Sequence, residues 1–187
     1  MITTSFANQT NVSCFSGNDG ELSSVSSFGG TGSTYTYSLD GVLFGPAFPI
    51  YDQLSAGIFT IYTQDVNNCI NIENFTITQP SEIIPNLAEL TAVNCIDTDN
   101  GVIISTPTGG TPNMGNYTFT FRDESPAIIS TAFTTSGIVG SLFAGNYTVE
   151  IEDVNGCFGY DTLTIAPTYT LSANLTSTPV SCNGYAD

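Results

Sequence analysis

The sequence predicts an all-β protein made of tandem immunoglobulin-like antiparallel β-sandwiches, with about seven strands in each. The segment LSAGIFTIYTQDVNNC at residues 54–69 returns without a gap as LFAGNYTVEIEDVNGC at residues 142–157, which indicates that one unit is repeated. Inside this block Tyr147, Val149 and Ile151 alternate with polar residues, and a two-residue period is typical of a half-buried strand. No stretch of ten or more residues has the apolar stripe of a helix.

Further strands are expected around the recurring block. Phe59, Ile61 and Thr63 occupy the matching inward positions of the first unit. Alternation also marks four other segments, which are YTYSLD at 35–40, NYTFTFRD at 116–123, NFTIT at 74–78 and TLTI at 162–165. The two units differ in length only where Gly, Pro, Asn and Ser indicate loops, because loops tolerate insertions better than strands do.

Proline-bearing connectors divide the chain. TQPSEIIP at 78–85 separates the units, and IAPTYT at 165–170 leads out of the second one. We therefore expect a first module at 1–83, a second at 84–168, and the start of a third, truncated module at 169–187. Since proline stops strand pairing and stiffens a connector, neighbouring modules are expected to be held in line as a rod.

Five cysteines stand in two alternating contexts. Cys14, Cys95 and Cys182 open a unit, with Asp or Asn five residues later, whereas Cys69 and Cys157 close a DVNxC turn. The simplest pairing is one disulfide per repeat, Cys14 with Cys69 and Cys95 with Cys157, which leaves Cys182 unpaired because the sequence ends first. Each bond would add roughly 4 kcal/mol to a small module and indicates an oxidising compartment. Zinc or nucleophilic roles are less favoured, since there is no CxxC spacing and no histidine.

The charge is strongly acidic. Seventeen Asp and Glu oppose a single base, Arg122, for a net charge of −16. Nucleic acids and anionic membranes are therefore improbable partners, because both are bound through several Lys or Arg. No run of eighteen apolar residues is present to span a membrane. The acid either keeps a secreted protein soluble and self-repelling or attracts cations, of which calcium is the usual one outside cells.

Calcium is the one cofactor to consider, and no other is expected. Acids recur before the closing cysteines and after the opening ones, and the expected disulfide would bring these two groups together. The candidate ligands are Asp19, Asp65, Asp97, Asp99 and Asp153. Against this hypothesis, Asp-Val-Asn-Gly is a good turn without any metal, because its Asp and Asn bond their own backbone.

Catalysis is not expected. Without His or Lys, a paired-carboxylate glycosidase is the only familiar chemistry left, and its candidates Glu150 and Glu152 occupy outward positions of a strand. A further alternative is carbohydrate or ice recognition by exposed threonines and tyrosines, as in YTYS and YTFTF, although threonine is also favoured on ordinary sheet exteriors.

The order of motifs resembles a known family. SCFSGNDG, FGGTGSTYTYSLDG, LSAGIFTIYTQDVNNC and FTITQP, followed by their counterparts in the second unit, are similar to the SprB repeat of gliding-motility adhesins from Bacteroidetes-type bacteria. Asn68 departs from the glycine usual in that family.

The resemblance implies a structural stalk in a large, extracellular cell-surface filament. Such a filament is exported by type IX secretion and contacts the gliding machinery through other parts of the parent protein. Its partners would be neighbouring repeats of the same chain and a surface polysaccharide or substratum.

Overall fold

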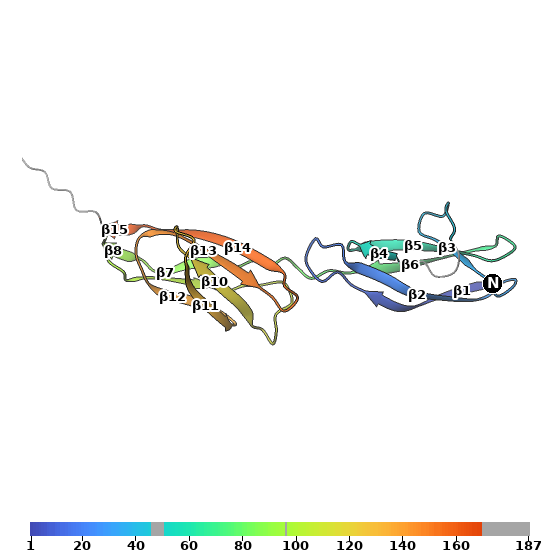
Figure 1. Ribbon diagram of the computed structural model, residues 1–187, viewed down its shortest axis with the longest axis horizontal. Coiled ribbons are helices and arrows are strands. Elements are labelled where there is room, and N and C mark those ends of the chain that lie inside the picture. Colours follow the sequence, from blue (N-terminus) through green and yellow to red (C-terminus); the bar gives the residue numbers. More distant parts are fainter. Residues whose placement is uncertain (46–50, 96, 170–187) are drawn as a thin grey trace, which may run out of the picture.

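The computed structural model describes residues 1–45, 51–95 and 97–169, and every element assigned in them is a β-strand (Figure 1). The all-β prediction is confirmed, and the antiparallel sheets are compatible with an immunoglobulin-like sandwich. In these ranges we find no helix with the length and hydropathy needed to cross a bilayer. The expected start of a third module, including Cys182, lies outside the described residues, apart from Tyr169.

The first half of the chain forms two three-stranded sheets. One has the order β1-β2-β4 and the other β3-β5-β6, with antiparallel pairing throughout. The strands are β1 Ile2–Thr10, β2 Gly20–Gly29, β3 Thr36–Ser38, β4 Tyr51–Leu54, β5 Gly57–Gln64 and β6 Ile70–Ile77. Their inward side chains meet in one core around Leu22, Ile61 and Ile77, all at most 1% exposed.

The second half repeats this arrangement with more strands. A four-stranded sheet β11-β10-β13-β14 accompanies a three-stranded sheet β12-β9-β7 and a short pair β15-β8. The strands are β7 Leu87–Thr91, β8 Val93–Cys95, β9 Gly101–Ser105, β10 Tyr117–Arg122, β11 Ile128–Thr134, β12 Gly137–Leu142, β13 Gly145–Glu152, β14 Phe158–Ile165 and β15 Pro167–Tyr169. A separate core forms around Ile103, Phe119, Phe121 and Val149.

The alternation read from the sequence is confirmed in the strand that carries the repeat. Tyr147, Val149 and Ile151 are buried on β13, while the residues between them are exposed or half-buried. In the first half the matching inward position Thr63 is polar and fully buried. Its hydroxyl is satisfied by the hydroxyl of Thr4 on β1, 2.9 Å away, so the core keeps its hydrogen bonding.

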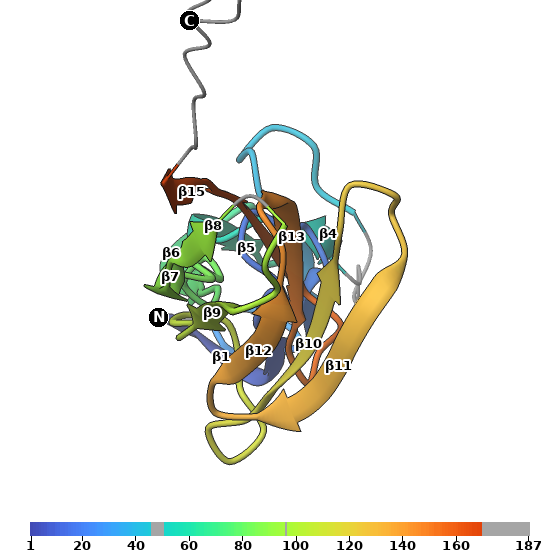
Figure 2. The ribbon, with the colours of Figure 1, turned by 90° about the vertical axis from the view of Figure 1, so that its left-hand side faces the viewer.

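The two halves follow one another along the long axis of the molecule (Figure 1), and viewed down that axis they lie one behind the other (Figure 2). Their strands run between two ends, which we call the entry pole and the exit pole. The entry pole, where the chain enters, holds residues 1–2, 29–30 and 65–69 in the first half. Its equivalent in the second half holds 81–83, 109–110 and 153–157.

The exit pole is the opposite end of each half. It holds residues 12–19 in the first half and 93–95 with 97–100 in the second, and the departing chain runs beside it. In the first half Val12 N–H donates to Thr78 O at 2.9 Å. In the second, β8 and β15 pair in parallel, with Pro167 opposite Val93 and Tyr169 opposite Cys95. Both halves therefore have the same polarity along the chain.

Candidate functional site at the junction of the two halves

The entry pole is built around one aspartate, which caps the DVNxC turn. In the first half Asp65 Oδ1 accepts the N–H groups of Asn67 and Cys69, each at 2.9 Å, and Oδ2 accepts that of Thr31 at 2.9 Å. These backbone donors, with Thr31 the strongest, hold the pKa of Asp65 below its ordinary value. The carboxylate thus ties the turn after β5 to the loop after β2.

The second half repeats these bonds with equivalent residues. Asp153 Oδ1 accepts the N–H groups of Asn155 and Cys157 at 2.9 and 3.0 Å, and Oδ2 accepts that of Thr111 at 2.7 Å. The matching geometry explains why the DVNxC block recurs without a gap. Its aspartate closes a turn, and the turn fixes where the closing cysteine stands.

A glycine pair completes the entry pole. Gly29 and Gly109 both have a φ of +84°, a conformation that favours glycine, and a tyrosine hydroxyl binds the carbonyl oxygen of each. Tyr35 Oη donates to Gly29 O at 2.6 Å, and Tyr117 Oη donates to Gly109 O at 2.7 Å. Burial, and after it the nearby charge of Asp153, raises the pKa of Tyr117 above its ordinary value.

The exit pole is also built twice. Ser13 N–H donates to Asp19 Oδ1 at 3.0 Å, and in the second half Asn94 N–H donates to Asn100 Oδ1 at 3.2 Å. A turn begins at the carbonyl of each opening cysteine, Cys14 and Cys95. The Ser13 hydroxyl, which also bonds Asp19, holds the pKa of that carboxyl below its ordinary value.

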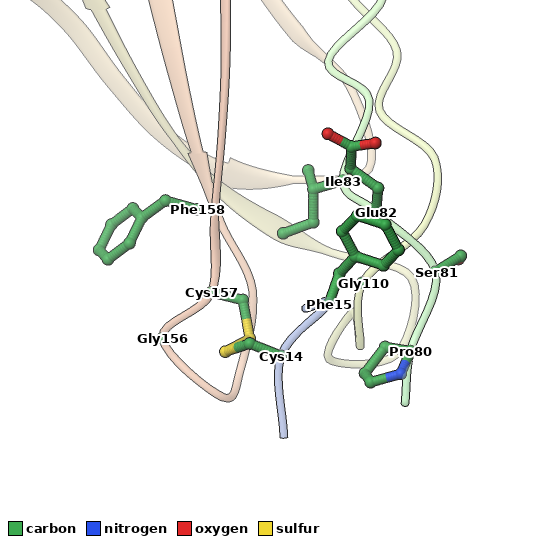
Figure 3. A pocket seen from close by; sticks show the side chains of 10 residues that line it. All are labelled: Cys14, Phe15, Pro80, Ser81, Glu82, Ile83, Gly110, Gly156, Cys157 and Phe158. Carbon is green, nitrogen blue, oxygen red and sulfur yellow. A yellow bond between two sulfur atoms is a disulfide. The ribbon is translucent and has the colours of Figure 1, made fainter. Parts of the chain in front are cut away.

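At the junction the exit pole of the first half meets the entry pole of the second. Cys14 forms a disulfide with Cys157, with Cα atoms 5.5 Å apart (Figure 3). Asn155 Nδ2 donates to Ser13 O across the junction at 3.2 Å, and Cys14 packs against the core of the second half. The two halves are therefore joined by a covalent bond in addition to the connecting chain.

A pocket of about 300 Å³ lies beside the disulfide (Figure 3). Phe15, from the first half, lines it together with Glu82 and Ile83 of the connector and Phe158 of the second half. The other lining residues are Cys14, Pro80, Ser81, Gly110, Gly156 and Cys157. Because the walls come from both halves, this pocket exists only when the two poles are docked.

The expected pairing of the cysteines within each unit is wrong. Cys14 lies at the exit pole of the first half and Cys69 at its entry pole, with the length of β5 between them. At about 3.3 Å per residue, a strand of 8 residues spans about 26 Å, whereas bridged cysteines have Cα atoms less than about 7 Å apart. Cys95 and Cys157 are separated in the same way in the second half. The disulfide expected inside each repeat is not formed, and the Cys14–Cys157 disulfide instead joins one repeat to the next.

The remaining cysteines are distributed at the two far ends. Cys69, at the first entry pole, and Cys95, at the second exit pole, are free and exposed. Cys182, expected to be unpaired by truncation, lies outside the described residues.

The acidic residues considered for calcium do not converge as expected. Asp19 lies at the exit pole and Asp65 at the entry pole of the first half, because the disulfide that was to bring them together does not form. Asp97 and Asp99 are exposed in the loop after Cys95. Within the described ranges no three acidic or cysteine side chains gather in a group that could hold a metal.

The junction itself was missed by the sequence reasoning, namely the roles of Phe15, Glu82 and Ile83. A signal existed in the strand directions. Cys14 precedes β2 and Cys69 follows β5, so tracing each strand from pole to pole would have placed the two cysteines at opposite ends. A linear reading of open and close contexts does not contain that information.

Comparison with known families supports the resemblance seen in the sequence. The SprB repeat model matches residues 6–44, which contain Cys14, its loop and the glycines Gly29 and Gly30, so the resemblance is confirmed for that segment. A search of curated proteins found no match. The SprB match suggests a repeat module of the cell-surface adhesin type.

Proposed function

We propose that this chain is a non-catalytic stalk segment of a secreted cell-surface adhesin, in which β-sandwich modules are locked end to end. The observation that carries the proposal is the Cys14–Cys157 disulfide between the two halves. A bond placed there joins two modules and does not hold one module shut. It restrains the angle between neighbours, which is the mechanical requirement of a spacer.

The junction has two covalent connections side by side. The first is the chain itself, which leaves β6 and passes through Pro80 and Pro85 into the second half, and proline limits its freedom. The second is the disulfide, reinforced by the bond from Asn155 Nδ2 to Ser13 O at 3.2 Å. With a single connection the halves would pivot, as domains joined by a linker commonly do. Two connections oppose bending and twisting.

Surface charge supports the same role. The net charge of −16 on 187 residues makes neighbouring stretches repel one another, which favours an extended, well-solvated filament over a collapsed one. The proposed partners are the neighbouring repeats of the same chain. A surface polysaccharide or substratum is a further proposed partner, and the gliding and type IX secretion machinery would be contacted by other parts of the parent protein.

The proposed location is extracellular, on a filament attached to the outer membrane. A disulfide between modules persists in an oxidising compartment and would be reduced in the cytoplasm, which favours the cell surface. Export by the type IX route and a part in gliding motility follow from the SprB resemblance, and both belong to this proposal.

Small-angle X-ray scattering tests the stalk proposal. The wild-type chain is expected to scatter as a single elongated particle, and the double variant Cys14→Ser/Cys157→Ser as a mixture of bent and straight ones with a smaller mean maximum dimension. The matched control is Cys69→Ser, which removes an exposed cysteine that is not in the bond. Identical scattering from the double variant and the wild type would contradict a bond that stiffens the junction.

A further inference from the structure

We infer that Cys69 and Cys95 each form the same kind of inter-module disulfide as Cys14–Cys157. Cys69 bonds the opening cysteine of a preceding module, and Cys95 bonds the closing cysteine of a following one. Modules are then linked by disulfides in series along the filament. This inference extends the proposed stalk function from one junction to a continuous chain of junctions. It rests on the equivalence of the poles, and the existing Cys14–Cys157 bond shows how two such poles dock.

The entry pole of the first half matches the docked entry pole of the second. Cys69 and Cys157 stand in equivalent aspartate-capped turns. Cys69 N–H donates to Asp65 Oδ1 at 2.9 Å, and Cys157 N–H donates to Asp153 Oδ1 at 3.0 Å. Only their exposure differs, because Cys157 is 8% exposed whereas Cys69 is exposed. The docked partner, rather than the turn, accounts for the burial of Cys157.

The cavity beside each closing cysteine is also equivalent. A pocket of about 480 Å³ at the first entry pole is lined by Ile2, Gly30, Cys69 and Ile70. The residues that stand in their places at the junction are Ile83, Gly110, Cys157 and Phe158. At the junction Cys14 and Phe15 of the preceding half complete the walls. The first entry pole thus has the surface onto which the exit loop of a preceding module would dock.

The exit pole of the second half offers the complementary surface. Cys95 and Cys14 each begin a turn of the same kind. Thr98 N–H donates to Cys95 O at 3.1 Å, and Gly17 N–H donates to Cys14 O at 3.0 Å. The departing chain lies beside it, because Thr168 Oγ1 donates to Val93 O at 2.8 Å. A module that followed this segment would therefore begin beside Cys95, as the second half begins beside Cys14.

The chemistry is thiol–disulfide exchange with a small disulfide as oxidant. The Cys69 thiolate attacks a sulfur of oxidised glutathione, which forms a mixed disulfide and releases one glutathione thiolate. The Cys95 thiolate of a second copy then attacks the Cys69 sulfur and releases the second glutathione. Two protein thiols lose two protons and two electrons, and one oxidised glutathione becomes two glutathione thiols.

Mixing two variants tests the inference with this chain alone. One carries Cys69→Ser and keeps Cys95, the other carries Cys95→Ser and keeps Cys69, and both carry Cys182→Ser to remove the remaining thiol. One variant is labelled with a heavy nitrogen isotope, and the pair is oxidised with glutathione at high protein concentration. The expected product is the mixed dimer. Random pairing would make it half of all dimers, whereas the inference predicts that nearly all dimers are mixed. Peptide mapping should find Cys69 bonded to Cys95.

The same experiment defines failure. A statistical mixture of the three dimers, or monomer in every sample, overturns the inference, and so does a Cys95–Cys182 bond in the wild-type chain. Circular dichroism of each variant confirms that it is folded, and both substitutions fall on exposed residues. If the mixture stays monomeric while the wild-type chain still scatters as a rigid rod, the stalk proposal stands and only the serial bond fails.

Discussion

The Cα atoms of Cys14 and Cys157 lie 5.5 Å apart although 143 residues separate them in the chain. Their bond joins the exit pole of one sandwich to the entry pole of the next. Each sandwich has its own core, so the disulfide is not needed to close either one. Its position gives it a role in the geometry between modules.

Removal of the bond should lower stability as well as stiffness. In the chain-entropy model, the stabilisation from closing a span of 143 residues is at most about 5 kcal/mol. We expect Cys14→Ser/Cys157→Ser to reduce the free energy of unfolding by up to this amount and to lower the midpoint in urea. The control Cys69→Ser should leave the midpoint unchanged. Equal midpoints for the double variant and the wild type would argue against the bond.

Gly109→Ala should destabilise the entry pole of the second half. Gly109 has a φ of +84°, and a Cβ there would lie 1.8 Å from Glu82 O, in the connector backbone. We expect a loss of about 2 kcal/mol or more in the free energy of unfolding, because both the conformation and the space oppose a side chain. Gly140→Ala is the matched control, since its Cβ would lie 3.6 Å from Val102 Cγ2. Equal losses from both variants in calorimetry would contradict this account.

Asp65→Asn should have an effect that depends on pH. The pKa of Asp65 in the folded chain lies below the ordinary 3.8, so its ionised form stabilises the fold above that value, and this contribution is lost as pH falls through the folded pKa. The variant should therefore be less stable than the wild type at about pH 7, and the difference should shrink towards about pH 2. Urea denaturation at several pH values measures it. Asp52→Asn, at an exposed residue of β4, is the control, and a difference independent of pH would count against the turn-capping role.

Chelation of calcium should leave the melting temperature unchanged. Asp65 and Asp153 already accept three backbone N–H groups each, which satisfies these carboxylates without a cation. Differential scanning calorimetry with EDTA and with added calcium measures the effect. A rise in melting temperature with calcium that EDTA reverses would restore the calcium hypothesis.

The strands could be predicted because their pattern is local. Burial of Tyr147, Val149 and Ile151 follows from a two-residue period, which holds wherever a strand has one face on a core. The recurrence of Asp65 and Asp153 likewise indicated a repeated turn, and the structure shows the hydrogen bonds that make it one. Local patterns of this kind are sufficient for the fold class.

The cysteine pairing could not be read in the same way because it depends on where the strands end. Cys14 and Cys69 appear as the opening and closing of one unit, yet one stands at each pole of that unit. Cys14 and Cys157 become neighbours only once two sandwiches are stacked with the same polarity. Contacts between modules are a property of the stack, and a repeat unit considered alone does not contain them.

The most direct test of the central claim is peptide mapping of the wild-type chain without reductant, after its free thiols have been blocked. The account predicts a peptide that joins Cys14 to Cys157, with Cys69 recovered as a blocked thiol from the monomer. A peptide that joins Cys14 to Cys69 would contradict it.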